Sequence, residues 1–259
     1  MGMPSLARPD GAELYWEHSG DGPGVLICNT FNLAPLDGLV ERLAASRRVV
    51  IYEPRGLGRS SQHGPYDLAT GVADAEALLE ETGPAEVALG IGDGTHRAIR
   101  LADTRPDLVD RVVFTSSALG RESGERAGFA ASTEVLHALM SLLRRDYRSG
   151  LRQMLSGSAA DEDEERRRLE ELVAAIPREV AIGYLEAWIA AESFDVARRL
   201  GGRLTALAYP GNAWFPVEMY EGMRDHLTEA CFEFVDDGPM MRPDLAAEVL
   251  LKVSEPAKG

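Results

Sequence analysis

Short apolar runs rich in β-branched residues alternate with amphipathic stretches along most of this 259-residue chain, and this alternation restricts its fold more than any other feature. Brief apolar runs are typical of buried strands, whereas apolar residues at helical spacing indicate helices. Strands that alternate with helices form βα units on a mainly parallel sheet. We therefore expect an α/β fold with strands at residues 14–17, 25–28, 49–52, 86–89, 112–115, 204–209 and 231–235.

Helical patterns fill the gaps between most of these strands. The strand signal is absent from residues 119–202, where helical spacing takes over. We therefore predict one core, built from residues 1–118 and 203–259, that is interrupted by a helical lid at residues 119–202. The expected helices are residues 36–45, 68–81, 95–104, 134–145, 164–175, 179–197, 217–227 and 245–253.

The charge balance excludes several classes of partner. Forty-two Asp and Glu residues against 27 Lys and Arg residues give a formal net charge of -15, which repels nucleic-acid phosphates and anionic lipids. We expect no nucleic-acid partner. We also expect no membrane partner, since no apolar stretch approaches the about 18 residues that span a bilayer.

The N-terminus has no secretory signal pattern, and both cysteines sit in apolar runs, so we expect a cytoplasmic protein. The predominance of arginine over lysine fits a G+C-rich bacterial genome.

Three segments occur in an order that is known from one large superfamily. Residues 11–23 form an opening hairpin pattern, and residues 50–60 read Val-Ile-Tyr-Glu-Pro-Arg-Gly-Leu-Gly-Arg-Ser. Residues 87–96 run from a strand through a glycine-rich turn into a helix. Over nearly the whole chain this order resembles the α/β-hydrolase superfamily, whose second motif carries Asp where this chain has Glu53. The resemblance implies the α/β-hydrolase fold: a mainly parallel central sheet flanked by helices, with a helical lid insertion.

The same resemblance implies that the catalytic triad of the superfamily is lost. The glycine-rich turn corresponds to the nucleophile elbow, which reads Gly-x-Ser-x-Gly. Gly90 and Gly94 keep the spacing, but the apex is Gly92, which has no side chain to attack a carbonyl. Trp214 falls where the acid is expected, and Pro239 takes the place of the general-base histidine. The resemblance thus indicates three degenerate triad positions.

A pocket is still implied by the resemblance. Backbone amides of the elbow and of the loop after the strand at residues 25–28 would form an oxyanion-like site. Loops beyond strand ends line the ligand crevice of open α/β sheets, and their apolar side chains favour a hydrophobic small molecule as ligand or substrate. The predicted pocket residues are Asn29, Thr30, Phe31, Phe215 and Met240.

Three polar residues are candidates for chemistry. Asp93 follows the apex and is the preferred catalytic group, although Asp at a helix start is also a common capping residue. His96 lies one turn further on, and His137 lies in the helical insertion; each is equally a candidate for a packed structural histidine. A register with Asp93 as the nucleophile would put Thr95 where the second glycine belongs.

Neither a cofactor nor a metal is expected. The sequence Gly-x-Gly-x-Gly-Thr at residues 90–95 lacks the third glycine of the dinucleotide motif, and no cluster has metal-ligand spacing. Three functions remain open. The first is a cofactor-independent, non-hydrolytic enzyme for cyclisation, isomerisation, elimination or proton transfer, in a biosynthetic pathway. The second is a non-catalytic ligand-binding pseudoenzyme or partner protein, and the third is an atypical hydrolase that uses Asp93. The sequence defines neither the substrate nor the oligomeric state.

Overall fold

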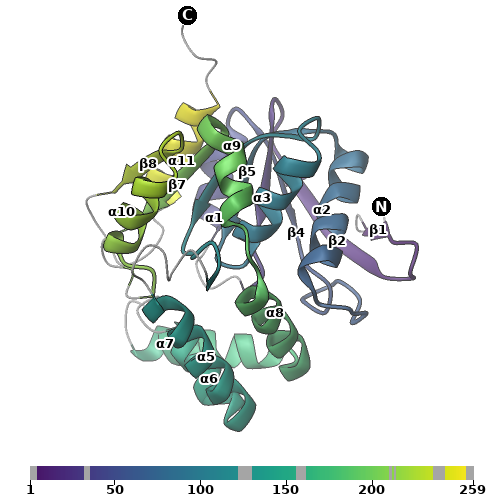
Figure 1. Cartoon of the computed structure of the whole chain (residues 1–259). Coiled ribbons are helices and arrows are strands. Elements are labelled where there is room, and N and C mark those ends of the chain that lie inside the picture. Colours follow the sequence, from purple (N-terminus) through teal and green to yellow (C-terminus); the bar gives the residue numbers. More distant parts are fainter. Residues whose placement is uncertain are drawn as a thin grey trace, which may run out of the picture.

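A sheet of eight strands forms the centre of the molecule (Figure 1). The computed structural model describes residues 5–31, 36–121, 130–155, 162–209, 212, 214–235 and 243–254. The strand order is β1-β2-β4-β3-β5-β6-β7-β8, and all neighbours from β4 to β8 pair in parallel. The strands are β1 (Ser5–Ala7), β2 (Glu13–Ser19), β3 (Gly24–Cys28), β4 (Arg48–Tyr52), β5 (Ala85–Ile91), β6 (Val109–Thr115), β7 (Leu204–Ala208) and β8 (Cys231–Phe234).

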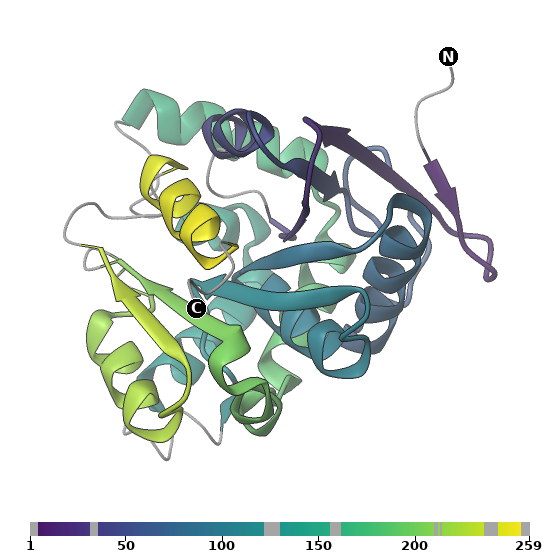
Figure 2. The same cartoon turned by 90° about the horizontal axis from the view of Figure 1, so that it is seen from above.

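Helices cover both faces of the sheet, as seen from above in Figure 2. On one face lie α1 (Asp37–Ala44) and α11 (Pro243–Val253). On the other face lie α2 (Leu68–Thr82), α3 (Gly94–Thr104), α9 (Phe194–Leu200) and α10 (Val217–His226). The short 3-10 helix η1 (Gly201–Arg203) leads from α9 into β7. The predicted α/β fold class is therefore confirmed.

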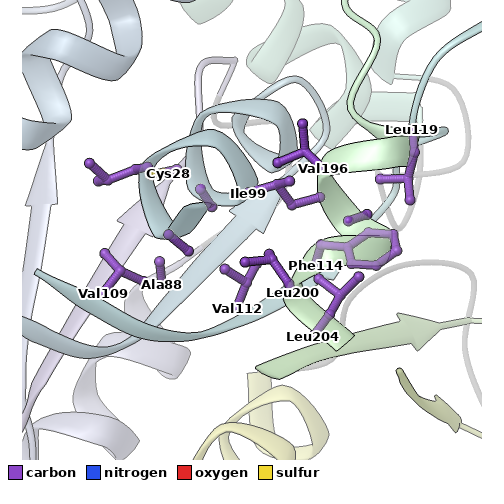
Figure 3. Packing of buried hydrophobic residues seen from close by; sticks show 14 of the residues in the cluster. Cys28, Ala88, Ile99, Val109, Val112, Phe114, Leu119, Val196, Leu200 and Leu204 are labelled. Atoms are coloured by element: carbon purple, nitrogen blue, oxygen red, sulfur yellow. The ribbon is translucent and has the colours of Figure 1, made fainter. Parts of the chain in front are cut away.

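The main core lies where α3 and α9 pack on β5 and β6, as the labelled side chains in Figure 3 show. Ile99 of α3, Phe114 of β6 and Leu200 of α9 are buried there. Burial of each such side chain stabilises the fold by about 1.5–3 kcal/mol. This packing fixes α3 against the carboxyl end of β5, which is the position where the sequence places the elbow.

Among the described residues between β6 and β7, four further helices sit together at one end of the sheet (Figure 1). We call them the helical segment: α5 (Ala130–Arg145), α6 (Tyr147–Leu155), α7 (Glu162–Ala175) and α8 (Arg178–Ala190). Their buried side chains form a second core that includes Phe31 and Leu57 from loops of the sheet. The hydroxyl of Tyr184 in α8 donates a hydrogen bond to the carbonyl oxygen of Arg55 at 3.0 Å. The division into core and lid at residues 119–202 stays a prediction.

Three features differ from the sequence expectation. The helix expected at residues 179–197 is interrupted between α8 and α9, because the Ser193 amide donates to the carbonyl oxygen of Leu119 at 2.7 Å. The serine hydroxyl is also engaged, at 2.9 Å from Nδ1 of His96. The helix α6 and the strand β1 were not expected.

Among the helices that the structure describes, none is both long and apolar enough to cross a lipid bilayer.

A buried ion pair connects the loop after β4 to α2. Nε and Nη2 of Arg55 donate to Oδ2 and Oδ1 of Asp74 at 2.7 and 2.8 Å, and both side chains are almost fully buried. Arg8 donates a further bond to Asp74 at 2.9 Å. Hydrogen bonding to Asp74 raises the pKa of Arg55 above its ordinary value. Since the same loop carries the carbonyl that Tyr184 binds, this pair also supports the attachment of the helical segment.

We predict that Asp74→Asn destabilises the fold by about 3 kcal/mol, because it removes the buried carboxylate and leaves the buried Arg55 paired only with the exposed Asp10. The matched control is Asp107→Asn, which breaks an exposed ion pair with Arg105 and should leave stability nearly unchanged. Urea unfolding followed by circular dichroism measures both free energies. Equal effects of the two substitutions would contradict the assigned role of the Asp74 pair.

Candidate functional site

The turn between β5 and α3 has the geometry of a nucleophile elbow. Gly92 adopts a φ of 58°, a left-handed conformation that favours glycine, and its amide donates to the carbonyl oxygen of Thr115 at 3.1 Å. The amide of Thr95 then donates to the carbonyl oxygen of Gly92 at 3.1 Å, which begins the first turn of α3. A Cβ on Gly94 would lie 1.9 Å from the carbonyl oxygen of Cys28, so the close approach of α3 to β3 requires glycine there.

The apex of this turn is covered by an aromatic ring from the helical segment. A Cβ built on Gly92 would lie 3.4 Å from Cη2 of Trp188. The indole also stacks on Phe215, with ring centroids 5.8 Å apart and an interplanar angle of 27°. A small space of about 10 Å³ beside the elbow is lined by residues that include Asp93, His96 and Trp188. This volume suits about one water molecule and no organic substrate.

The Asp93 side chain belongs to a buried network. Its Oδ2 accepts hydrogen bonds from Oγ1 of Thr30 at 2.6 Å and from Nη1 of Arg97 at 3.0 Å. Nη2 of Arg97 also donates to Oγ1 of Thr30 at 2.7 Å. Burial opposes the charged form of Arg97, but Asp93 together with Tyr52, Cys28 and Tyr184 outweighs this effect and raises the pKa of the guanidinium. The carboxylate makes no capping bond to the start of α3 and is held in an ion pair instead.

The two candidate histidines lie in different surroundings. His96 is buried, with Nδ1 2.9 Å from the hydroxyl of Ser193. Burial, together with the charges of Arg100 and Arg97, lowers the pKa of His96 to about 3. His137 is exposed on α5 and lines neither the space at the apex nor the larger cleft described below. The structure thus brings His96 close to Asp93 and leaves His137 apart.

The loop after β7 lies beside the elbow. Asn212 accepts hydrogen bonds from the amides of Trp214 and Phe215 at 3.0 and 3.1 Å, and its Nδ2 donates to the hydroxyl of Ser116 at 3.1 Å. Phe215 is buried and supports Trp188, whereas Trp214 is half-buried. The predicted positions Pro239 and Met240 lie outside the described residues.

A second, much larger cavity opens next to this network. Its volume is about 800 Å³, and it lies between the strands β2 and β4, helix α1, the loop after β3, and helix α7. Asn29, Thr30 and Phe31 line this cleft, whereas Phe215 does not. Of the five predicted pocket residues, three therefore share one cavity, which we call the α1–α7 cleft.

Three residues of the site were not predicted from the sequence. Arg97 follows Asp93 by four positions, a spacing that places acid and base on one helix face and signals their pairing. Trp188 and Asn212 reach the elbow from distant segments and left no local signal. Within the part of the chain that the structure describes, no three His, Cys, Asp or Glu side chains form a group that could hold a metal ion.

Solved structures provide the comparison for the whole chain. An esterase (EaEST) from Exiguobacterium antarcticum superposes with a TM-score of 0.81 at 18% identity, covering 98% of this chain and 99% of that one. The enol-lactonase from Burkholderia xenovorans LB400 has a TM-score of 0.75 at 18% identity, with 96% and 99% covered. MGS-M2, an α/β hydrolase enzyme from a deep-sea metagenome library, has a TM-score of 0.73 at 16% identity, with 96% of each chain covered.

Sequence comparison reaches a smaller part of the chain. No protein-family model matches it. A probable oxidoreductase, EphD, from Mycobacterium tuberculosis is 38% identical over 85 residues, which cover 30% of this chain and only 14% of that protein. The shared architecture, in contrast, extends over nearly the full length of the solved structures. The chain therefore has the α/β-hydrolase fold.

Proposed function

We propose that this protein binds an apolar small molecule in the α1–α7 cleft and performs no covalent catalysis at its elbow. One observation supports this proposal most directly. The space that Asp93, His96 and Trp188 line holds only about 10 Å³, whereas the α1–α7 cleft offers about 800 Å³. A volume of 300–1,000 Å³ is typical of small-molecule sites. A ligand of this size therefore fits in the α1–α7 cleft beside Thr30 and does not fit in the small space beside Asp93.

The ion pair and hydrogen bonds of Asp93 support the same proposal. A general base needs a carboxylate that can reach a substrate proton, directly or through one water. Asp93 is paired with Arg97 and Thr30 and lies beneath Trp188. Releasing it would break a buried ion pair, at a cost of about 3–5 kcal/mol, and would also displace the indole.

His96 does not replace the missing general base. A base works best when its pKa lies near the operating pH, and the pKa of His96 is lowered to about 3. Its Nδ1 is also engaged with Ser193. The imidazole is therefore neutral at pH 7 and a weak proton acceptor.

A second candidate is the non-hydrolytic enzyme that the sequence favours, with proton transfer, cyclisation, isomerisation or elimination at Asp93. One observation supports it: Asp93 and His96 line the same small space beneath Trp188. If the indole moved outward, these two groups would face a common site. This candidate predicts chemistry that depends on Asp93 and increases when Trp188 is made smaller.

Filling the α1–α7 cleft should abolish ligand binding. Ala174 and Ala175 are neighbouring exposed residues of α7, but only Ala175 lines the cleft. We expect Ala175→Trp to weaken the binding of the neutral fluorescent probe N-phenyl-1-naphthylamine at least tenfold, because the indole occupies the cleft. Ala174→Trp should bind the probe as the wild type does. Fluorescence titration measures both; equal affinities of the two variants would refute the proposed site.

Hydrolytic assays test the binding proposal against the third function that the sequence leaves open, an atypical hydrolase that uses Asp93. We expect the wild type, Gly92→Ser and Trp188→Ala to convert p-nitrophenyl esters and lactones no faster than buffer, since no activated nucleophile is present. Circular dichroism verifies that each variant is folded. Turnover in the wild type or in Trp188→Ala that is lost on adding Asp93→Asn would contradict the binding proposal and favour an atypical hydrolase that uses Asp93.

The buried His96 should make folding pH-dependent. Its pKa is about 3 in the folded protein and about 6.5 in an unfolded chain, so the unfolded state binds the extra proton between these values. Stability therefore falls as the pH decreases from about 6.5 toward 3, by at most about 1.4 kcal/mol per pH unit from this group.

His96→Asn removes this titration while keeping a polar side chain, and His63→Asn is the matched control in an exposed loop. Urea unfolding at pH 7.5, 6.0 and 5.0 should give a smaller loss of stability for His96→Asn than for the wild type or the control. The same pH dependence in all three proteins would show that His96 is not buried in its neutral form.

A further inference from the structure

The inner walls of the α1–α7 cleft are apolar and come from separate elements. Ile27 of β3, Ile51 of β4, Val40 of α1 and Leu172 of α7 all line it. A cavity with such walls favours a ligand whose main body is apolar, because binding removes apolar surface from water on both sides.

The charged residues that line the cleft are mostly acidic. Four carboxylates come from different parts of the fold, whereas only two arginines, Arg59 and Arg168, line it. Arg168 has interactions of its own and is not free. The whole chain also carries a formal charge of -15, which attracts cations over longer distances. The carboxylates are Glu17, Glu41, Glu53 and Glu171.

The positive charge of Arg59 is already compensated by Glu53, which also lines the cleft. Its Nε and Nη2 donate to Oε1 of Glu53 at 3.0 and 2.7 Å, and its guanidinium carbon lies 3.3 Å from the ring centroid of Tyr15. Hydrogen bonding to Glu53 raises the pKa of Arg59 above its ordinary value. Arg59 and Glu53 therefore compensate each other, and this arginine is not available to hold an anionic ligand.

Two of the four carboxylates are not held in a close ion pair. Glu17 lies 3.8 Å from the guanidinium of Arg59, which Glu53 occupies at closer range, and it accepts a long bond of 3.3 Å from the hydroxyl of Tyr15. Glu41 is exposed and makes no ion pair with any residue that the structure describes. These two groups stand on β2 and α1 beside the apolar wall.

We infer that the ligand of the α1–α7 cleft is an apolar amine, whose ammonium group lies near Glu17 and Glu41 and whose apolar body packs on the inner walls. This inference rests on the proposed function of the cleft and adds the charge of its ligand. Binding then combines burial of apolar surface with a charge interaction that excludes carboxylic acids of the same shape.

Three probes of similar shape test the sign of the charge: 4-phenylbutylamine, 4-phenylbutanol and 4-phenylbutyrate. Displacement of N-phenyl-1-naphthylamine should rank the amine first and the carboxylate last. Glu17→Gln and Glu41→Gln should each weaken amine binding about two- to fivefold, the size typical of exposed charge pairs, and leave the alcohol unchanged. Glu81→Gln, an exposed residue at the end of α2, is the control and should have no effect. Added salt should weaken amine binding alone.

The outcomes separate the two proposals. If the alcohol or the carboxylate binds as tightly as the amine, and Ala175→Trp still abolishes binding, the inference that the ligand is an amine is overturned. The proposal that the cleft binds an apolar ligand then still holds. If the Gln variants weaken all three probes equally, their effect is structural, and the inference is overturned in the same way. If Ala175→Trp leaves every probe bound as before, the cleft itself is not the binding site.

Discussion

The buried pair of Asp93 and Arg97, bridged by Thr30, is the interaction on which the arrangement of the site depends. It joins the first turn of α3 to the loop after β3 at the carboxyl edge of the sheet. Thr30 lines the α1–α7 cleft, while Asp93 lines the small space at the apex. The network therefore separates the two spaces, and it keeps the carboxylate neutralised by its partner rather than available to a ligand.

The fold could be predicted from the sequence because its main signals are local. Buried parallel strands read as short apolar runs, and the close contact of α3 with β3 requires glycine at position 94, so the elbow is visible in the sequence itself. The interruption between α8 and α9 could not be predicted in this way. It depends on the bond from Ser193 to Leu119, two residues far apart in the chain.

Less of the candidate site could be predicted from the sequence, because most of its contacts join residues that are far apart in the chain. The glycine apex is a local feature, and the position of Arg97 four residues after Asp93 gave a local signal for their pairing. Trp188 covers the apex only because the helical segment folds back over the sheet, and the α1–α7 cleft forms between elements that are separated by more than a hundred residues. Local patterns carry no information about such distant contacts.

The stack of Trp188 on Phe215 bears on whether single substitutions could introduce a nucleophile at the elbow. A serine that arose at position 92 would meet an aromatic wall and bring no rate advantage while the indole is present. A smaller residue at position 188 would open a void and reduce stability before any nucleophile existed to use the space. Each single substitution is thus neutral or harmful, so a nucleophile at position 92 would gain a use only together with a smaller residue at position 188.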